Sequence, residues 1–271
     1  MVDDLERKRI VVLTGQDIYH DATSSILIES GLNVVGICRA SSKTYGLPIN
    51  MMTRWIKRGY FFRTIGQIVG RVLYIMLRGN EDKRILGELY NVENINRLLR
   101  TWGGPILDVK SYSEKETFKI LKSWKPDVIV VHSYEWVDKK IRELPKDSLV
   151  VGGHPGITPQ YRGAHSAFWA IYNSDFKNVG WTVFHLDAGV DTGDIIQQGR
   201  LKVGEDDSYF TLGWKGMIEI AKCQASALLV WEKTGSITRN KHVEIPENSE
   251  YPVPPLFAHL KYWRNLREFR Q

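Results

Sequence analysis

The stretch "VVGGHPGITPQYRGAHSAFWA", residues 150–170, contains an apolar run, a glycine pair, a histidine and a helical pattern in close succession. A short apolar run that stops at glycines is typical of a buried strand. The prolines and glycines that follow predict a loop, and the segment from Ser166 onward predicts a helix. The stretch therefore predicts a strand that delivers His154, at its carboxyl end, into a loop before a helix.

The chain before this stretch alternates strand and helix patterns. Residues 9–15, "RIVVLTG", are a β-branched run stopped by glycine. The segment "DATSSILIESG" is a helical pattern with Asp21 as its predicted N-cap, and "LNVVGICR" after it is a second strand pattern. These segments predict one βαβ unit, in which the two strands run parallel.

Two more strands are predicted in "DVIVVHS", residues 127–133, and "SLVVGGH", residues 148–154. The helical pattern before the first of them starts with the serine-to-acid spacing of a capping box. This alternation predicts an α/β fold with a doubly wound, mostly parallel sheet that helices cover on both faces. Ligands of such sheets bind at the carboxyl ends of strands, where the strand order reverses. His132 and His154 both lie at such ends.

Residues 50–101 interrupt the alternation with a basic, amphipathic helical segment. Its first part has no acid before Glu81 and contains these bases: Arg54, Lys57, Arg58, Arg63, Arg71 and Arg78. One interpretation is a helical cap that packs on the domain or on a second subunit. The other is a surface for an anionic substrate or for lipid headgroups. The sequence does not separate the two.

After the loop, "VGWTVFHLDAGVDTGDIIQQGRLKV" predicts two strands joined by an acidic, glycine-rich turn. The turn brings Asp187, Asp191 and Asp194 close together. A turn of this composition is usually only solvated. Because it follows a histidine loop, a role in the same site is the second interpretation.

Both segments resemble the folate-dependent formyltransferase family, which includes glycinamide ribonucleotide formyltransferase, methionyl-tRNA formyltransferase and the sugar N-formyltransferases. The resemblance is clearest over residues 104–202, and "KPDVIVVHSYEW" shares it. The first family motif is matched by His154, Pro155, Pro159, Arg162 and Gly163, and the second by Asp191, Thr192 and Gly193. The resemblance implies a Rossmann-like core and transfer of a formyl group from 10-formyltetrahydrofolate to an amine.

The resemblance also assigns the site. His154 handles the proton that the attacking amine releases, or donates to the developing oxyanion, and Asp191 orients its ring. Position 152 carries the asparagine whose amide donates to the formyl oxygen in the family, whereas this chain has Gly152. The predicted folate-binding residues are Ser133, Tyr134, Trp136 and Asp187. The predicted acceptor-binding residues are Tyr161, Arg162, His20 and Asp21, although helix capping also explains Asp21.

The acceptor is inferred by family analogy. The first strand is followed by "TGQDIYHD", which lacks the phosphate-cradling glycines expected for a glycinamide ribonucleotide. About 70 residues follow "GRL", too few for the extra β-barrel of the tRNA enzymes. The expected acceptor is therefore a nucleotide-linked amino sugar of polysaccharide biosynthesis, with no nucleic acid partner. We expect a catalytic domain over residues 1–203, with its helical insertion at about 50–101, and a C-terminal helix and extension over residues 204–271.

Composition sets the remaining expectations. The net charge of +6 favours an anionic partner without identifying it. The 2 cysteines, Cys38 and Cys223, are too few for a disulfide framework and are expected as buried thiols. The charged start "MVDDLERKR" and the absence of a long apolar run predict a cytoplasmic protein. Membrane contact through residues 54–78 and a homodimer both stay open.

Two other function classes remain. His154, His165, His185, Asp187, Asp191 and Asp194 are enough ligands for a metal hydrolase, although no metal-binding spacing joins them. Gly152 raises the second alternative, a catalytically weakened homologue that binds the folate or the sugar without turnover. Loss of one oxyanion donor costs roughly 100- to 1000-fold in rate.

Overall fold

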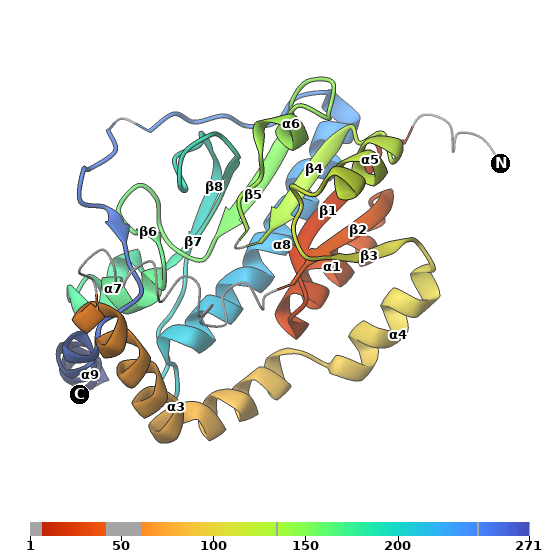
Figure 1. The fold of residues 1–271 in the computed structure, drawn as a ribbon. Coiled ribbons are helices and arrows are strands. Elements are labelled where there is room, and N and C mark those ends of the chain that lie inside the picture. Colours follow the sequence, from red (N-terminus) through yellow and green to blue (C-terminus); the bar gives the residue numbers. More distant parts are fainter. Residues whose placement is uncertain (1–6, 42–60, 134, 243, 271) are drawn as a thin grey trace.

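The computed structural model describes residues 7–41, 61–133, 135–242 and 244–270. A seven-stranded sheet in the order β3-β2-β1-β4-β5-β7-β8 forms its centre (Figure 1). The strands are β1 (Ile10–Gly15), β2 (Val34–Ala40), β3 (Ile106–Val109), β4 (Val128–His132), β5 (Val150–His154), β7 (Gly180–His185) and β8 (Ile195–Arg200). Strands β1 to β5 pair in parallel, and β7 and β8 are antiparallel. The prediction of a doubly wound, mostly parallel α/β sheet is confirmed.

The helices, with two short strands, surround this sheet. They are α1 (Ile18–Glu29), α3 (Phe61–Leu89), α4 (Val92–Trp102), α5 (Lys115–Ser123), α6 (Lys139–Arg142), α7 (Ser166–Tyr172), η2 (Phe176–Asn178), α8 (Tyr209–Thr234) and α9 (Leu256–Arg270). Strands β6 (Arg162–Gly163) and β9 (Glu250–Tyr251) pair separately. Two capping predictions are wrong: Asp17 is the N-cap of α1, which places Asp21 in its first turn, and Glu114 rather than Ser113 is the N-cap of α5.

Both faces of the central strands are buried. Val12, Val130 and Val151 pack with Ile220 and Leu228 of α8 on one face. On the other face, a second cluster is formed by Leu13, Val131, Val150, Leu121 of α5 and Ile141 of α6. Burial on both faces explains why these strands are continuous apolar runs rather than alternating ones.

A third cluster, rich in aromatic residues, joins the C-terminal part of the chain to the α3 helix. Tyr74 of α3, Phe168 of α7, Tyr209 of α8 and Tyr262 of α9 are all buried in it. Helix α3 belongs to the segment that the sequence marks as a basic, amphipathic insertion, and residues 50–60 of that segment lie outside the described residues. Among the described helices, none is both long and apolar enough to cross a membrane.

Candidate functional site

His154 is the last residue of β5, where it pairs with Thr182 of β7. Side chains alternate along a strand, so His154 and Gly152 share the face of Val150. Gly153 lies on the opposite face, where a Cβ would meet Ile220 of α8 at 2.2 Å. His154 is only 6% exposed. The strand therefore delivers the histidine to the carboxyl edge of the sheet, on the face opposite α8.

Both ring nitrogens of His154 have partners. Nδ1 lies 3.4 Å from Oδ2 of Asp191. Nε2 lies 2.9 Å from the carbonyl oxygen of Tyr161 and 2.7 Å from Oγ of Ser166. Gly156 is required beside this ring, because a Cβ there would lie 2.7 Å from Nε2 and 2.4 Å from Cβ of Ser166. The ring is thus held between a carboxylate, a carbonyl and a hydroxyl.

Asp191 is positioned by the turn between β7 and β8. Its φ of +52° places it in the left-handed region, which aspartate tolerates better than most residues. Its Oδ2 accepts a hydrogen bond from the main-chain N–H of Gly163 at 3.0 Å. Asp187 caps the same turn, accepting hydrogen bonds from the Gly189 N–H and the Thr192 hydroxyl. The turn therefore aims one aspartate at His154 and uses another to fix its own shape.

The predicted acceptor residues Tyr161 and Arg162 are buried and bonded within the protein. The Arg162 guanidinium donates to the Val190 carbonyl and to the Ser249 hydroxyl. The Tyr161 hydroxyl donates to Asp175 at 3.0 Å. The Arg162 contacts connect the Asp191 turn to the chain near β9. In this structure the polar groups of the two residues therefore bond to the protein and hold the loops that carry His154 and Asp191 in place.

Gly152 lies against an aromatic ring. It pairs with Phe184 across β5 and β7. A Cβ at position 152 would be 3.0 Å from Cε2 and Cζ of Phe184 and 3.2 Å from Cδ1 of Leu186. Phe184 is only 2% exposed. Its ring therefore takes up space that a side chain at position 152 would need.

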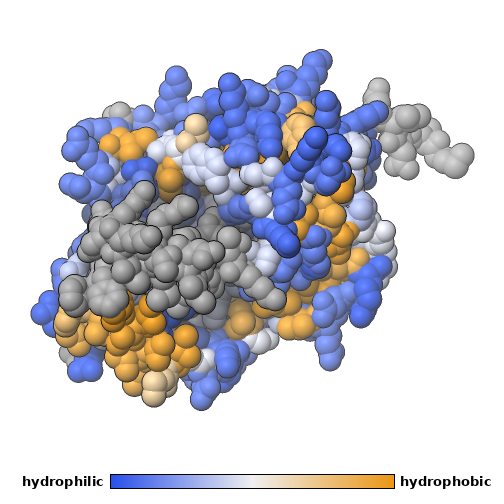
Figure 2. Space-filling model, viewed as in Figure 1, coloured by the Kyte–Doolittle hydropathy of each residue, from blue (hydrophilic) through white to orange (hydrophobic). Residues whose placement is uncertain are grey.

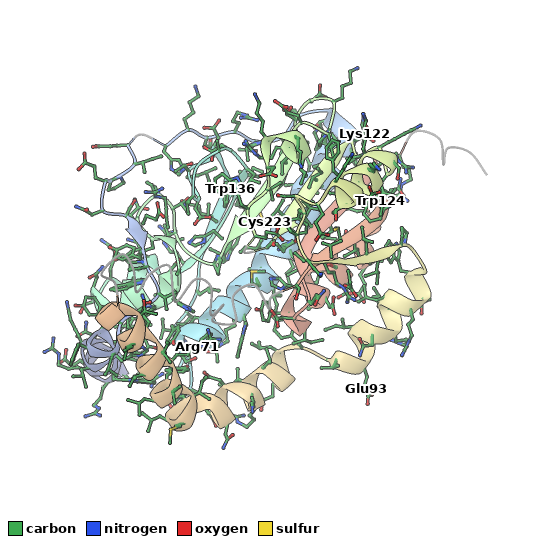
Figure 3. The ribbon with its side chains drawn as sticks, in the orientation of Figure 1. Arg71, Glu93, Lys122, Trp124, Trp136 and Cys223 are labelled. Carbon is green, nitrogen blue, oxygen red and sulfur yellow. The ribbon has the colours of Figure 1, made fainter. Side chains whose placement is uncertain are left out.

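The predicted folate-side residues lie in the loop that follows β4 and in the Asp187 turn. Trp136 is 52% exposed on that loop (Figure 3). The Ser133 hydroxyl is hydrogen-bonded to the Tyr112 hydroxyl and accepts from the Glu135 N–H, both at 3.0 Å. Burial raises the pKa of the Glu135 carboxyl, which is bonded to Ser111 and to the Tyr112 N–H. Tyr134 lies outside the described residues.

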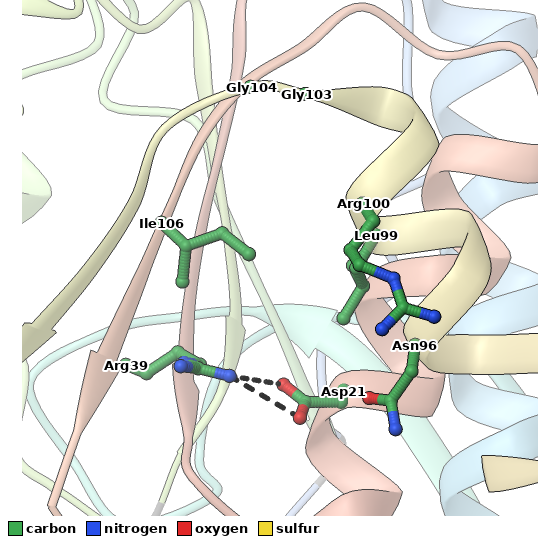
Figure 4. A pocket seen from close by; sticks show the side chains of 8 residues that line it. All are labelled: Asp21, Arg39, Asn96, Leu99, Arg100, Gly103, Gly104 and Ile106. Carbon is green, nitrogen blue, oxygen red and sulfur yellow. Dashed lines mark hydrogen bonds and ion pairs between the residues drawn. The ribbon is translucent and has the colours of Figure 1, made fainter. Parts of the chain in front are cut away.

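The other two predicted acceptor residues lie on α1. Asp21 pairs with Arg39 of β2 at 3.2 Å and borders a cavity of about 410 Å³ (Figure 4). Leu99 of α4 and Ile106 of β3 form its apolar walls. Burial raises the pKa of the Asp21 carboxyl, although Arg39 opposes the shift. The His154–Asp191 pair is not part of this cavity lining.

His20 and His132 are buried on the α1 and α8 side of the sheet. Each is 1% exposed. Burial lowers the pKa of His20 to about 3 and that of His132 to about 3. Both rings are therefore neutral at physiological pH. His132 ends β4 as His154 ends β5, but the two side chains lie on opposite faces, since Val131, and not His132, pairs in register with Gly152 on the His154 face.

The acidic turn does not form a metal centre among the residues that the structure describes. No group of three or more histidine, cysteine or acidic side chains there is placed to hold a metal ion. Asp187 bonds within its turn, Asp191 faces His154, and Asp194 pairs with Arg239 at 3.1 Å. The three aspartates among the six residues considered as metal ligands thus each contact a different partner, and they do not converge on one point.

Three contacts were missed by sequence reasoning. Ser166 begins a helix, and nothing in its neighbours indicates that it touches the histidine twelve residues earlier. Phe184 is one apolar residue in a strand pattern. Tyr112 reaches the β4 loop from a distant segment, and its hydroxyl bonds both Ser133 and the Thr14 carbonyl. For Phe184 alone a signal existed, because a glycine inside a strand often marks a close approach of another group.

Comparisons with known proteins show the family. Residues 78–218 match the family model described as formyl transferase. A methionyl-tRNA formyltransferase of Kosmotoga olearia is 33% identical over 136 residues, 47% of this chain and 43% of the relative. One of Alkaliphilus oremlandii is 29% identical over 156 residues, 57% of this chain and 48% of the relative. The chain spans about half the length of the curated relatives it matches.

Solved structures share the fold. A glycinamide ribonucleotide transformylase of Symbiobacterium toebii has a TM-score of 0.56 at 15% identity, covering 89% of this chain and 98% of that chain. A sugar N-formyltransferase of a Shewanella species has a TM-score of 0.52 at 11% identity, covering 95% of this chain and 87% of that chain. At these identities the likeness shows the fold alone.

Proposed function

Because the chain belongs to the formyl transferase family, we propose that it transfers a formyl group from 10-formyltetrahydrofolate to the amine of an anionic acceptor. The observation that carries the proposal is the His154–Asp191 pair at the carboxyl end of β5, 3.4 Å from Nδ1 to Oδ2. This pair lies inside the segment that matches the family model. The match supports the reaction class, and the pair supplies groups for the proton transfer that the reaction needs.

The reaction replaces one C–N bond by another. The neutral amine attacks the formyl carbon and forms a tetrahedral intermediate with a negatively charged oxygen. The bond between that carbon and N10 of the folate then breaks. One proton leaves the attacking nitrogen and one reaches N10, so the products are the formamide and tetrahydrofolate with no net change in protons. A group that accepts and returns a proton is therefore needed beside the amine.

His154 and Asp191 fit this task. The carboxylate lies beside Nδ1 and the Tyr161 carbonyl lies beside Nε2, so each ring nitrogen faces a hydrogen-bond acceptor. A positive ring next to the intermediate also stabilises its oxyanion. The Asp191 side chain is 19% exposed, which leaves a carboxylate oxygen within reach of an amine. We assign the first proton acceptance to this pair.

The loops at the same edge of the sheet offer some of the groups that a folate donor needs and lack one of them. Trp136 offers a half-exposed aromatic face, and Leu186 is a partly buried apolar neighbour on the next strand end. Ser133 and Asp187 are already bonded within their loops, so they fix the shape of those loops. The amide that the family places at position 152 is missing, and Phe184 fills the adjacent space. The donor to the formyl oxygen is therefore His154, a main-chain N–H of the glycine loop, or a bound water.

For the acceptor we propose a nucleotide-linked amino sugar, used in the cytoplasm. The net charge of +6 supports an anionic acceptor, and the fold is shared with a sugar N-formyltransferase. Methionyl-tRNA is the second candidate, because the curated relatives are named for it. Both acceptors present a primary amine on an anionic carrier.

The test is an incubation of the protein with 10-formyltetrahydrofolate and a panel of nucleotide-linked amino sugars, with methionyl-tRNA as a separate arm. Tetrahydrofolate release and acceptor mass are measured together. Tetrahydrofolate with a formylated amino sugar supports the whole proposal. Formylation of methionyl-tRNA alone overturns the acceptor and keeps the reaction. Folate and sugar binding without turnover in any arm favours the catalytically weakened homologue.

A further inference from the structure

Helix α3 buries one stripe and exposes the opposite one. On the buried side, Gly70 lies against α9, where a Cβ would be 3.1 Å from the Leu256 Cα. Tyr74 is 2% exposed and stacks on Trp263 with ring centroids 6.1 Å apart. Helix α3 also packs on α8. The buried side of α3 is thus packed against α8 and α9.

The outer side of the same turns is apolar and exposed. Ile65, Val69, Val72 and Met76 are 39%, 38%, 50% and 77% exposed. Further exposed apolar residues of this helix are Leu73, Ile75 and Leu77. Arg71 is the single charged residue between Thr64 and Leu77, and it borders a small cavity with His165. A helix that is apolar on its outer side as well is normally buried.

Helix α9 extends this surface. Phe257 and Leu260 are 79% and 73% exposed and lie on the helix that packs beside α3. Figure 2 shows a hydrophobic area where the first part of α3 lies in Figure 1. We give the name α3 face to the exposed apolar residues of the two helices: Ile65, Val69, Val72, Leu73, Met76, Leu77, Phe257 and Leu260.

We propose that the α3 face binds the same face of a second copy of this chain, with the two α3 helices antiparallel about a two-fold axis. The outer residues Ile65, Val69, Val72 and Met76 are spaced four, three and four apart, which is the seam of a paired helix. An axis between Val69 and Val72 places each against the other in the partner. The same axis places Ile65 against Met76.

Size and charge favour this occupant. A stable interface buries on the order of 800 Å² on each partner, and eight apolar side chains exposed by between a third and four-fifths contribute area to it. The seam has no charged residue, so the two copies bring no like charges together at its centre. Antiparallel helices also pair their dipoles favourably.

The first test measures the mass of the full chain in solution by sedimentation over a range of concentrations. We expect a dimer whose dissociation constant rises about 100-fold or more in Val72→Glu, because the change places two carboxylates at the axis. Lys83→Glu is the matched control, since it adds an acid to an exposed position of the same helix beyond the seam, and we expect it to leave the dimer unchanged. Circular dichroism checks that both variants fold. A chain that stays monomeric, or a dimer that Val72→Glu does not weaken, overturns the proposal.

The second test reads the orientation. Chains with Ile65→Cys are mixed with chains with Met76→Cys and oxidised, while the native Cys38 and Cys223 are buried. We expect disulfide-linked dimers in the mixture and few in either variant alone. Crosslinking within each single variant would show parallel helices and overturn the antiparallel arrangement. Binding of a monomer to vesicles of phosphatidylcholine and phosphatidylglycerol in equal parts, lost in Val72→Glu, would assign the face to lipid instead.

Discussion

The ring of Phe184 packs on Gly152, with Cε2 and Cζ 3.0 Å from the position of a Cβ at residue 152. The two residues are partners across β5 and β7. The absence of an asparagine at this position is therefore matched by a buried ring on the neighbouring strand. The two residues have to be changed together to test what position 152 does.

We expect Gly152→Asn alone to lower the free energy of unfolding by about 1 to 3 kcal/mol, because the new side chain overpacks against Phe184 and Leu186. Formyl transfer should fall as well. Urea unfolding and turnover with a verified acceptor measure the two effects. A variant as stable and as active as the parent would show that this ring does not occupy the site.

The double variant Gly152→Asn with Phe184→Val separates the two explanations of the glycine. In a weakened homologue it restores a donor and makes room for it, so transfer rises above that of the parent chain. In an enzyme adapted to its glycine, transfer stays below the parent. We expect the second outcome, because His154, Asp191 and Gly163 keep their contacts in this structure. Phe184→Val alone is the control for the loss of the ring.

We expect Ser166→Ala to reduce kcat about 10-fold while the chain stays folded, since its hydroxyl lies 2.7 Å from Nε2 of His154 and positions the ring. The pH profile of kcat should shift as well, which a purely structural serine would not cause. Ser25→Ala removes a comparably buried serine that bonds only the Ala22 carbonyl. Equal effects of the two substitutions on kcat would contradict the role of Ser166 in positioning His154.

Trp136→Ala tests the folate side. The indole is 52% exposed, so its loss should leave stability unchanged. We expect KM for 10-formyltetrahydrofolate to rise about 10-fold with kcat nearly constant, because the ring contributes equally to the ground state and the transition state. Val230→Ala, at a site 53% exposed on α8, is the control. An unchanged KM would place the folate elsewhere.

Acid should destabilise the protein through its two buried histidines. Burial lowers the pKa of His132 and of His20 to about 3, whereas the unfolded value is 6.5, so between these pH values the unfolded chain binds more protons. Their stabilising contribution is complete above pH 6.5 and decreases as the pH falls toward 3. At about pH 5 each of the two histidines lowers the free energy of unfolding by about 2 kcal/mol relative to its value above pH 6.5.

His132→Leu isolates this effect from the carboxyl groups that titrate in the same range. We expect the difference between the unfolding free energies at about pH 7.5 and about pH 5 to shrink by about 2 kcal/mol relative to the parent. Urea titrations at both pH values measure it. An unchanged difference would mean that His132 is already protonated in the folded protein or reaches water there.

Much of the fold follows from local patterns in the sequence. Apolar runs such as residues 128–131 and the helical patterns between them predict the parallel sheet, because each pattern reports burial on one or two faces. The antiparallel strands β7 and β8 were predicted as strands, but nothing local fixes their direction. The start of α1 was misplaced because Asp17 and Asp21 are equally suitable caps by residue type.

The site was predicted less completely. His154 and Asp191 lie in recognisable motifs, and the structure places their side chains next to each other. Arg162 and Tyr161 lie in the same motif, yet their polar groups bond Ser249, Val190 and Asp175. Which way a side chain points depends on neighbours far away in the sequence. For the same reason Ser166 and Phe184, whose roles depend on cross-strand and loop contacts, could not be found from pattern alone.

The most direct test of the central claim is the rate of formyl transfer in three chains: the parent, His154→Ala and Asp191→Asn. Asparagine keeps the size of Asp191 and tolerates its left-handed backbone, so the second variant removes only the charge. With 10-formyltetrahydrofolate and an accepted amine, we expect the parent to release tetrahydrofolate and formylated product together. Each variant should retain its fold by circular dichroism and lose about 100-fold or more of the rate. Either variant turning over at a rate close to that of the parent would contradict the assignment of this pair as the catalytic centre.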